Sequence, residues 1–193
     1  TVHTKDGASY TGSHLLVAVG RKSNHDKLNL EAAGIEPTRT GVKVDASMRT
    51  TNRKVYAIGD AAGGLQFTHV AGYHAGVIIR SMLFGLPSRA MTSHIPWVTF
   101  TDPELAQVGL TEGQARQQHG DKLEVVRFHY NHNDRAIAER KTRGLIKVMV
   151  VKGRPVGASI AGYQAGELIS LWALVLADNM KMRQVAGMGS PYP

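Results

Sequence analysis

The sequence contains no cysteine among its 193 residues. The chain therefore carries no disulfide scaffold, no cysteine-ligated zinc site and no thiol chemistry of its own. It also lacks an apolar run of about 18 residues, the minimum for a membrane-spanning helix, and it opens without a signal-like segment. These absences predict a cytoplasmic protein with no membrane partner. Hydrophobic residues still make up 42% of the chain, which is ordinary for a globular protein.

Acidic residues are also scarce, since 15 Asp and Glu stand against 23 Lys and Arg and the net charge is +8. Such an excess raises the question of nucleic acid binding. However, no five cations are consecutive, the densest cluster (135–143) includes Glu139, and aromatic residues do not alternate with basic ones. We therefore expect a solvated basic face, or a channel that attracts phosphate-bearing cofactors, and no nucleic acid partner. The alternative is a basic, non-enzymatic module that binds nucleic acid or protein.

Several common cofactor and catalytic motifs are missing. No Gly-x-Gly-x-x-Gly follows a predicted strand, no P-loop is present, and there is no Gly-x-Ser-x-Gly elbow. The nearest approach to metal-ligand spacing is His129 and His132, which have no carboxylate pair nearby. Two such histidines are more often surface residues than ligands, so we predict no metal site.

The first half of the chain predicts strands separated by long loops, then one helix. A turn at Asp6-Gly7 separates two strands, and the second ends in an apolar run, Leu15–Val19, that predicts a strand buried in a sheet. The other expected elements are a short helical segment at 28–33, strands at 42–45 and 55–58, and a helix with Thr68 as N-cap that ends by Gly85. The residues expected to be buried along this helix are Val70, His74, Val77, Ile78 and Ser81.

After a linker at 85–94, the second half has the pattern of an antiparallel sheet with helices. The expected strands are 96–100, 123–130, 145–151 and 156–161, of which the last two form a hairpin. The segment from Thr111 to Gln114 fits a capping box for a helix that runs to about His119. A later helix, 164–180, carries an apolar stripe of Leu168, Leu171, Trp172, Val175 and Leu176.

One strand ending is the best candidate for a binding site. The predicted strand Val55–Ile58 ends in Gly59-Asp60, which presents a carboxylate at the carboxyl edge of an α/β sheet, where ligands bind. Asp60 can accept hydrogen bonds from a hydroxylated cofactor, and the small Gly59 lets that cofactor approach the backbone. The helix that starts at Thr68 offers N–H groups and a positive dipole end to a carbonyl or anionic ring edge.

Six segments with characteristic sequences follow one another along the chain: 15–24, 51–60, 65–71, 96–112, 134–136 and 165–169. Together they resemble the pyridine nucleotide-disulfide oxidoreductases, the flavoprotein family of dihydrolipoamide dehydrogenase, glutathione reductase and mercuric reductase. The resemblance implies part of an α/β FAD- and NAD(P)-binding region at 1–88, then an α+β dimerisation domain at 89–193 with an antiparallel sheet and flanking helices. It implies FAD and NAD(P)H as cofactors. It also implies a homodimer, whose interface we expect to include the helix with Leu168, Leu171 and Trp172.

The resemblance also implies roles for individual residues. Asp60 would hydrogen-bond the ribityl chain of FAD. Gly20 would lie near NAD(P), although an ordinary strand-ending turn explains Gly20 equally well. The backbone before the helix would meet the pyrimidine edge of the flavin at Gln66, Phe67, Thr68 and His69. The start of the helix would then stabilise negative charge on the reduced flavin.

The family's FAD fingerprint, redox cysteine pair and nucleotide fingerprint would precede residue 1, and we expect the chain to be an inactive fragment of a longer enzyme. At its other end, Tyr192 stands where many members carry an acid/base histidine, and Pro191-Tyr192 is similar to the Phe-Pro-Tyr of mercuric reductases. A phenol, whose ordinary pKa is about 10, is a poor base near neutral pH, but it can donate a hydrogen bond or orient a substrate. The substrate would be a small disulfide, a metal ion or a quinone-like molecule. An ordinary aromatic residue near a frayed end is the alternative for Tyr192.

Overall fold

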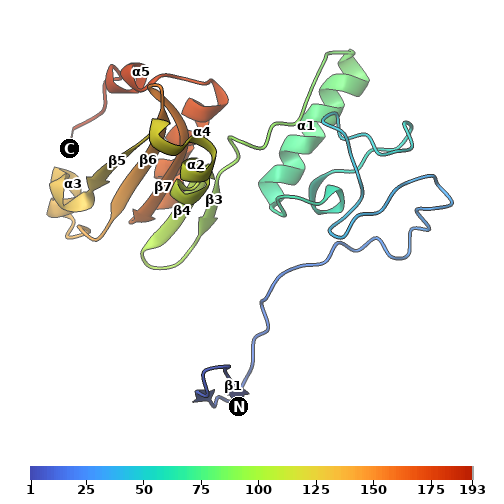
Figure 1. The fold of residues 1–193 in the computed structure, drawn as a ribbon, viewed down its shortest axis with the longest axis horizontal. Coiled ribbons are helices and arrows are strands. Elements are labelled where there is room, and N and C mark those ends of the chain that lie inside the picture. Colours follow the sequence, from blue (N-terminus) through green and yellow to red (C-terminus); the bar gives the residue numbers. More distant parts are fainter. Residues whose placement is uncertain (193) are drawn as a thin grey trace. The chain divides into compact units, whose positions relative to one another are not determined.

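The computed structural model describes residues 1–192. The chain divides into two compact units, residues 1–90 and 91–193, and their elements are drawn in Figure 1. Among the described residues, no helix is both long enough and apolar enough to cross a membrane.

The second unit is built on a five-stranded antiparallel sheet in the order β3-β4-β7-β6-β5. Its strands are β3 (Trp97–Thr99), β4 (Glu104–Gly109), β5 (Leu123–His129), β6 (Leu145–Val151) and β7 (Arg154–Gly162). The predicted strands and the α+β architecture are confirmed, whereas the sequence analysis did not predict β4. The β6–β7 hairpin turns at Lys152 and Gly153, whose φ angles of 50° and 71° suit the two-residue turns of twisted hairpins.

Helices accompany this sheet within residues 91–192. They are α2 (Glu112–His119), α3 (Asp134–Ala138), α4 (Ala165–Ala177) and α5 (Met182–Ala186). The predicted capping box is confirmed at the start of α2. There the Thr111 N–H donates to Gln114 Oε1 at 2.9 Å, and the Gln114 N–H donates to Thr111 Oγ1 at 3.4 Å.

The two faces of the sheet differ in polarity. Even-numbered residues of three strands form an apolar core with α4: Ala106, Val108, Val148, Val150, Ala158 and Ile160. Ala165 and Ile169 complete this core from α4. The predicted stripe on α4 is therefore wrong in part, because the helix turns Ile169 inward and leaves Leu168 and Leu171 42% and 37% exposed.

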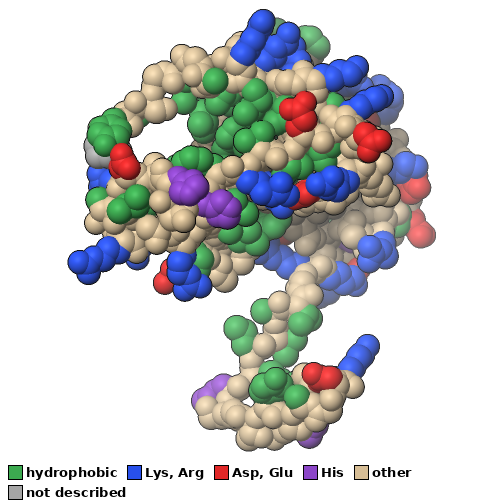
Figure 2. Space-filling view, turned by 60° about the vertical axis from the view of Figure 1, so that its left-hand side comes forward, with side chains coloured by type: hydrophobic (Ala, Val, Ile, Leu, Met, Phe, Trp, Pro, Cys, Tyr) green, Lys and Arg blue, Asp and Glu red, His purple; other side chains and the backbone are tan. Residues whose placement is uncertain are grey.

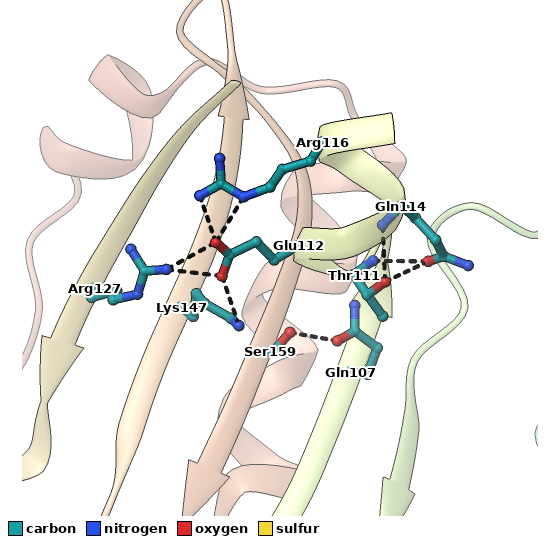
Figure 3. A network of polar contacts seen from close by, with 8 residues as sticks. All are labelled: Gln107, Thr111, Glu112, Gln114, Arg116, Arg127, Lys147 and Ser159. Atoms are coloured by element: carbon teal, nitrogen blue, oxygen red, sulfur yellow. Dashed lines mark hydrogen bonds and ion pairs between the residues drawn. The ribbon is translucent and has the colours of Figure 1, made fainter. Parts of the chain in front are cut away.

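Odd-numbered residues on the opposite face form a polar row across the strands (Figure 3). Gln107, Ser159, Lys147 and Arg127 are successive register partners on β4, β7, β6 and β5. Ser159 Oγ donates to Gln107 Oε1 at 2.5 Å. Lys147 and Arg127 lie opposite each other with like charge, an arrangement that destabilises a strand pair unless an acid compensates it.

Glu112, in the first turn of α2, supplies that acid (Figure 3). Its carboxylate oxygens lie 2.7 Å from Arg116 Nη2, 2.8 Å from Arg127 Nη2 and 3.0 Å from Lys147 Nζ. The hydrogen bonds from Arg116 and Lys147 are the main reasons why the pKa of Glu112 falls from 4.5 to about 2. The capping box and this network together fix α2 against the sheet.

The variant Glu112→Gln leaves three cations without their acid, so we expect it to destabilise the fold at neutral pH. The pKa of Glu112 is lower in the folded state, so the carboxylate stabilises the fold above about pH 4.5, and this contribution is lost as the pH falls toward 2. Urea unfolding across this range should therefore show a difference between wild type and variant that shrinks with falling pH. The exposed Glu124→Gln is the control, and a difference that does not change with pH would contradict the prediction.

The first unit contains less regular structure. Its elements are β1 (Val2–His3), β2 (Ser9–Tyr10), the 3-10 turn η1 (Gly59–Ala62) and α1 (Thr68–Phe84). The strands expected at 42–45 and 55–58 are reduced to isolated bridges, Pro37 with Val42 and Arg49 with Tyr56. The helical segment expected at 28–33 consists of turns that end at Gly34, where φ is 67°.

The prediction of a buried strand at Leu15–Val19 is wrong. These residues have no regular secondary structure, and Leu16 and Val19 are 88% and 91% exposed. A central strand is buried only when neighbouring strands and covering elements enclose it. The sheet described within residues 1–90 pairs only β1 with β2, so the run stays unpaired.

The helix α1 agrees closely with its sequence pattern. Its N-cap is Phe67, with an extended φ of −128°, and Thr68 is the first helical residue, not the cap as predicted. The predicted inner face is buried at Val70, His74 and Val77 and half-buried at Ile78 and Ser81. Gly85 ends the helix in the left-handed conformation, with φ of 62°.

Candidate functional site

The carboxylate of Asp60 is presented by η1, which follows directly on residues 55–58. Gly59 opens this turn with φ of 57°, and its N–H donates to Nδ1 of His74 at 3.2 Å. His74 is 5% exposed, and burial lowers the pKa of its ring. The neutral ring accepts at Nδ1, so a buried hydrogen bond joins the turn to α1. The sequence analysis placed His74 on the buried face but did not predict this role.

Close backbone packing fixes the shape of the same turn. A Cβ added at Gly59 would lie 2.8 Å from Ala71 Cβ, and one at Gly41 would lie 2.5 Å from the Ala61 carbonyl oxygen. Neither position therefore tolerates a larger residue without movement of its neighbours. The Asp60 side chain, in contrast, remains 46% exposed, so its oxygens are accessible to a ligand.

Residues 20–23 hold the turn from a second direction. Ser23 is 5% exposed, and its Oγ lies 2.7 Å from the Asp60 carbonyl oxygen. Arg21 Nη1 donates to the Gln66 carbonyl oxygen at 3.0 Å and lies 3.8 Å from Asp60 Oδ2. The structure thus brings Asp60 and Gln66 together through Arg21, and Gly20 precedes Arg21 in the chain with φ of 136°. Arg21 lies in the segment 15–24, but no pattern in the sequence predicted a role for it.

The remaining predicted residues lead into α1. No side chain caps the start of this helix. The aromatic ring of Phe67 stacks on that of His69, with centroids 5.3 Å apart and an interplanar angle of 5°. Because the N–H groups of the first turn and the helix dipole make an uncapped start electropositive, the backbone around Thr68 is suited to an electron-rich group.

Tyr192 belongs to the second unit and is 83% exposed. Its hydroxyl donates to Asp134 Oδ2 at 2.8 Å. Asp134 is in the first turn of α3, which Asn133 caps by accepting from the Ala136 N–H. Because the phenol proton is engaged with Asp134, the Tyr192 oxygen keeps its lone pairs for a ligand.

His129 and His132 have ring centroids 6.4 Å apart. Throughout residues 1–192, no group of three or more His, Asp or Glu side chains is arranged to hold a metal ion. Lys and Arg side chains on the face shown in Figure 2 are interspersed with acidic and neutral ones.

The residues around Asp60 fit FAD. The half-exposed Asp60 carboxylate can accept hydrogen bonds from the hydroxyls of a ribityl chain, and the uncapped start of α1 suits an electron-rich ring edge. At Gly64, between these two features, a Cβ would meet nothing within 4 Å. The backbone between Asp60 and the start of α1 is therefore open to solvent at Gly64.

Two family models match the chain, and together they cover most of it. The family described as "Pyridine nucleotide-disulphide oxidoreductase, dimerisation domain" matches residues 95–193, and "Pyridine nucleotide-disulphide oxidoreductase" matches residues 1–75. A dihydrolipoyl dehydrogenase of Bacillus subtilis is 36% identical over 86% of this chain and 36% of its own length. A mercuric reductase of Lysinibacillus sphaericus is 35% identical over 92% of this chain and 33% of its own.

Two solved structures of related proteins also have a similar fold. LpdA from Mycobacterium tuberculosis superposes with a TM-score of 0.89 at 26% identity, over 99% of this chain and 42% of its own. The flavoprotein disulfide reductase RclA from Escherichia coli gives a TM-score of 0.79 at 31% identity, over 91% of this chain and 41% of its own.

The chain spans about a third of the length of the curated relatives it matches. The dimerisation-domain match alone covers more than half of the chain, and the match at 1–75 precedes it in the expected order. Of the two functions that the sequence left open, these matches support the oxidoreductase over the basic interaction module. The chain belongs to the pyridine nucleotide-disulphide oxidoreductase family.

Proposed function

We propose that this chain is the C-terminal part of an FAD-dependent, NAD(P)H-using oxidoreductase of the disulfide and mercuric reductase type. It contributes one edge of the flavin site and a dimerisation domain. The observation that carries the proposal is the convergence of Asp60, Gln66 and the start of α1, joined by Arg21 and His74. Because the chain has no cysteine, the thiols of a dithiol mechanism come from residues outside it.

Bound FAD supplies the hydride and electron transfer chemistry of such an enzyme. In this chain, Asp60 accepts hydrogen bonds from the ribityl hydroxyls. The backbone from Gln66 to His69 would bind the pyrimidine edge, and the positive end of α1 would favour negative charge at that edge. Gly20 would lie close to the nicotinamide nucleotide, where a residue without a side chain would let the cofactor approach.

The test of the flavin site is FAD affinity in the full-length protein. Asp60→Ala removes a charged acceptor, and we expect the dissociation constant for FAD to rise about tenfold or more. Asp26→Ala is the matched control, since Asp26 is an exposed carboxylate that pairs with Lys22 at 2.7 Å. Flavin fluorescence quenching measures both. A wild-type protein that binds no FAD would overturn the proposal, as would an isolated 193-residue chain that binds stoichiometric FAD and reduces a disulfide.

Tyr192 acts in this proposal by orienting the substrate, not as an acid or base. Asp134 holds its hydroxyl at 2.8 Å, and a small disulfide, a metal ion or a quinone-like molecule meets the exposed oxygen. Tyr192→Phe should lower kcat/KM about tenfold, the effect of one lost hydrogen bond, without changing the shape of the pH profile. Steady-state kinetics with each substrate class measures this. Loss of an ionisation from the profile would instead indicate acid/base catalysis.

The dimer of the proposal forms through α4. Its outward side carries Leu168, Leu171 and Leu174, which are 42%, 37% and 62% exposed, and α4 lies within the matched dimerisation domain. An apolar face of this kind is buried when a second copy packs on it across a two-fold axis.

Leu174→Asp places a charge in this interface, so we expect the dimer to dissociate to monomers. Sedimentation velocity over a concentration series measures the change. Gln118→Asp, an exposed position on α2, should leave the dimer intact. A wild-type protein that remains monomeric at high concentration would contradict the prediction.

A further inference from the structure

We propose that Arg21 is a positioning residue for the flavin, and this inference rests on the function proposed above. The Arg21 guanidinium lies between the two groups that are to contact FAD from different segments. It donates to the Gln66 carbonyl oxygen at 3.0 Å and lies 3.8 Å from Asp60 Oδ2. Arg21 thereby fixes the distance between the ribityl-binding carboxylate and the segment that binds the pyrimidine edge.

The segment that carries Arg21 is itself anchored to the same turn. Ser23 lies two residues after Arg21 in the same irregular segment. Ser23 Oγ, buried in the unit, lies 2.7 Å from the Asp60 carbonyl oxygen and 2.5 Å from that of Thr40. Ser23 therefore contacts the backbone of Asp60 while Arg21 lies near its carboxylate. The contact of Ser23 also restrains the backbone of the segment from which the Arg21 side chain extends.

The Arg21–Asp60 pair is poorly suited to stabilising the fold. The Arg21 and Asp60 side chains are 66% and 46% exposed, and pairs with such exposure contribute little to stability. The exposed pair instead leaves carboxylate lone pairs for a ligand, while the guanidinium restricts the rotation of the carboxylate. A group oriented before the ligand arrives loses less entropy on binding, which increases affinity.

The geometry also calls for arginine at this position. The guanidinium Nη1 carries two N–H groups in a rigid planar fork, so this one atom reaches the Gln66 carbonyl oxygen and approaches the Asp60 carboxylate together. A lysine ammonium is a compact charge on a flexible stem. Arg21→Lys should therefore keep attraction to Asp60 but hold Gln66 less firmly.

The experiment is a double-mutant cycle on FAD affinity in the full-length protein. We expect Arg21→Gln to raise the dissociation constant about fivefold to tenfold, and Arg21→Lys to restore part of that loss. Combined with Asp60→Asn, the Arg21→Gln change should add less than its effect alone, because part of the effect of Arg21 passes through Asp60 while the rest passes through Gln66. Lys22→Gln is the matched control, since Lys22 is the next residue and pairs with Asp26 outside the site.

Two further readouts separate positioning from a structural role. The melting temperature of the FAD-free Arg21→Gln protein should stay within about 2 °C of wild type. The visible flavin absorption of the loaded variant should shift, because the pyrimidine edge is held differently. A large fall in the melting temperature of the FAD-free protein would identify Arg21 as a structural residue and overturn the proposal.

The outcomes also separate this inference from the proposed function. If Asp60→Asn weakens FAD binding and Arg21→Gln does not, only the role of Arg21 is overturned. The same holds if the effects of the two variants multiply fully in the double mutant. If the wild-type protein binds no FAD, the proposed function is overturned and the role of Arg21 falls with it.

Discussion

The hydrogen bond from the Gly59 N–H to His74 Nδ1 determines where the candidate site lies on its unit. Gly59 opens the turn that carries Asp60, and His74 lies on the helix whose start borders the same site. A protonated imidazole has no free acceptor nitrogen, so the contact requires a neutral ring. Burial lowers the pKa of His74 and maintains that state. This hydrogen bond and the close packing of Ala71 against Gly59 therefore fix the positions of the Asp60 carboxylate and of the start of α1 relative to each other.

The second unit depends on a different constraint: one face of its sheet is apolar and packs against α4, and the other face carries charged and polar side chains. The side with α4 is closed by Tyr130, whose ring lies 2.6 Å from where a Cβ at Gly144 or Gly162 would be. Its hydroxyl donates to the Tyr163 carbonyl oxygen at 3.2 Å, and burial raises its pKa. On the other side, Glu112 offsets the charges that the strand register places next to each other. Tyr130 therefore closes the apolar face, and Glu112 compensates the charges on the polar face.

The sequence predicted the second unit well because its signals are local. The β6–β7 hairpin and the capping box of α2 follow from turn and cap preferences within a few residues. The burial of Leu15–Val19 was mispredicted because it depends on strands elsewhere in space, and the same apolar pattern cannot report whether they are present. At the site, the strand ending and the resemblance to a family indicated Asp60 and the start of α1, whereas the contacts of Arg21 and His74 join residues 45 and 15 positions apart. No spacing rule relates such pairs.

The extended run Leu15–Val19 has a consequence for the chain in solution. It is uncharged, contains no proline and exposes Val17 at 69% and Val19 at 91%. Backbone groups of such a stretch are open to a strand from another molecule, which is how edge-to-edge aggregation begins. The charge of Arg21, which follows the run, limits such pairing. In the isolated polypeptide this run is the segment at which such pairing would start, and the net charge of +8 opposes it.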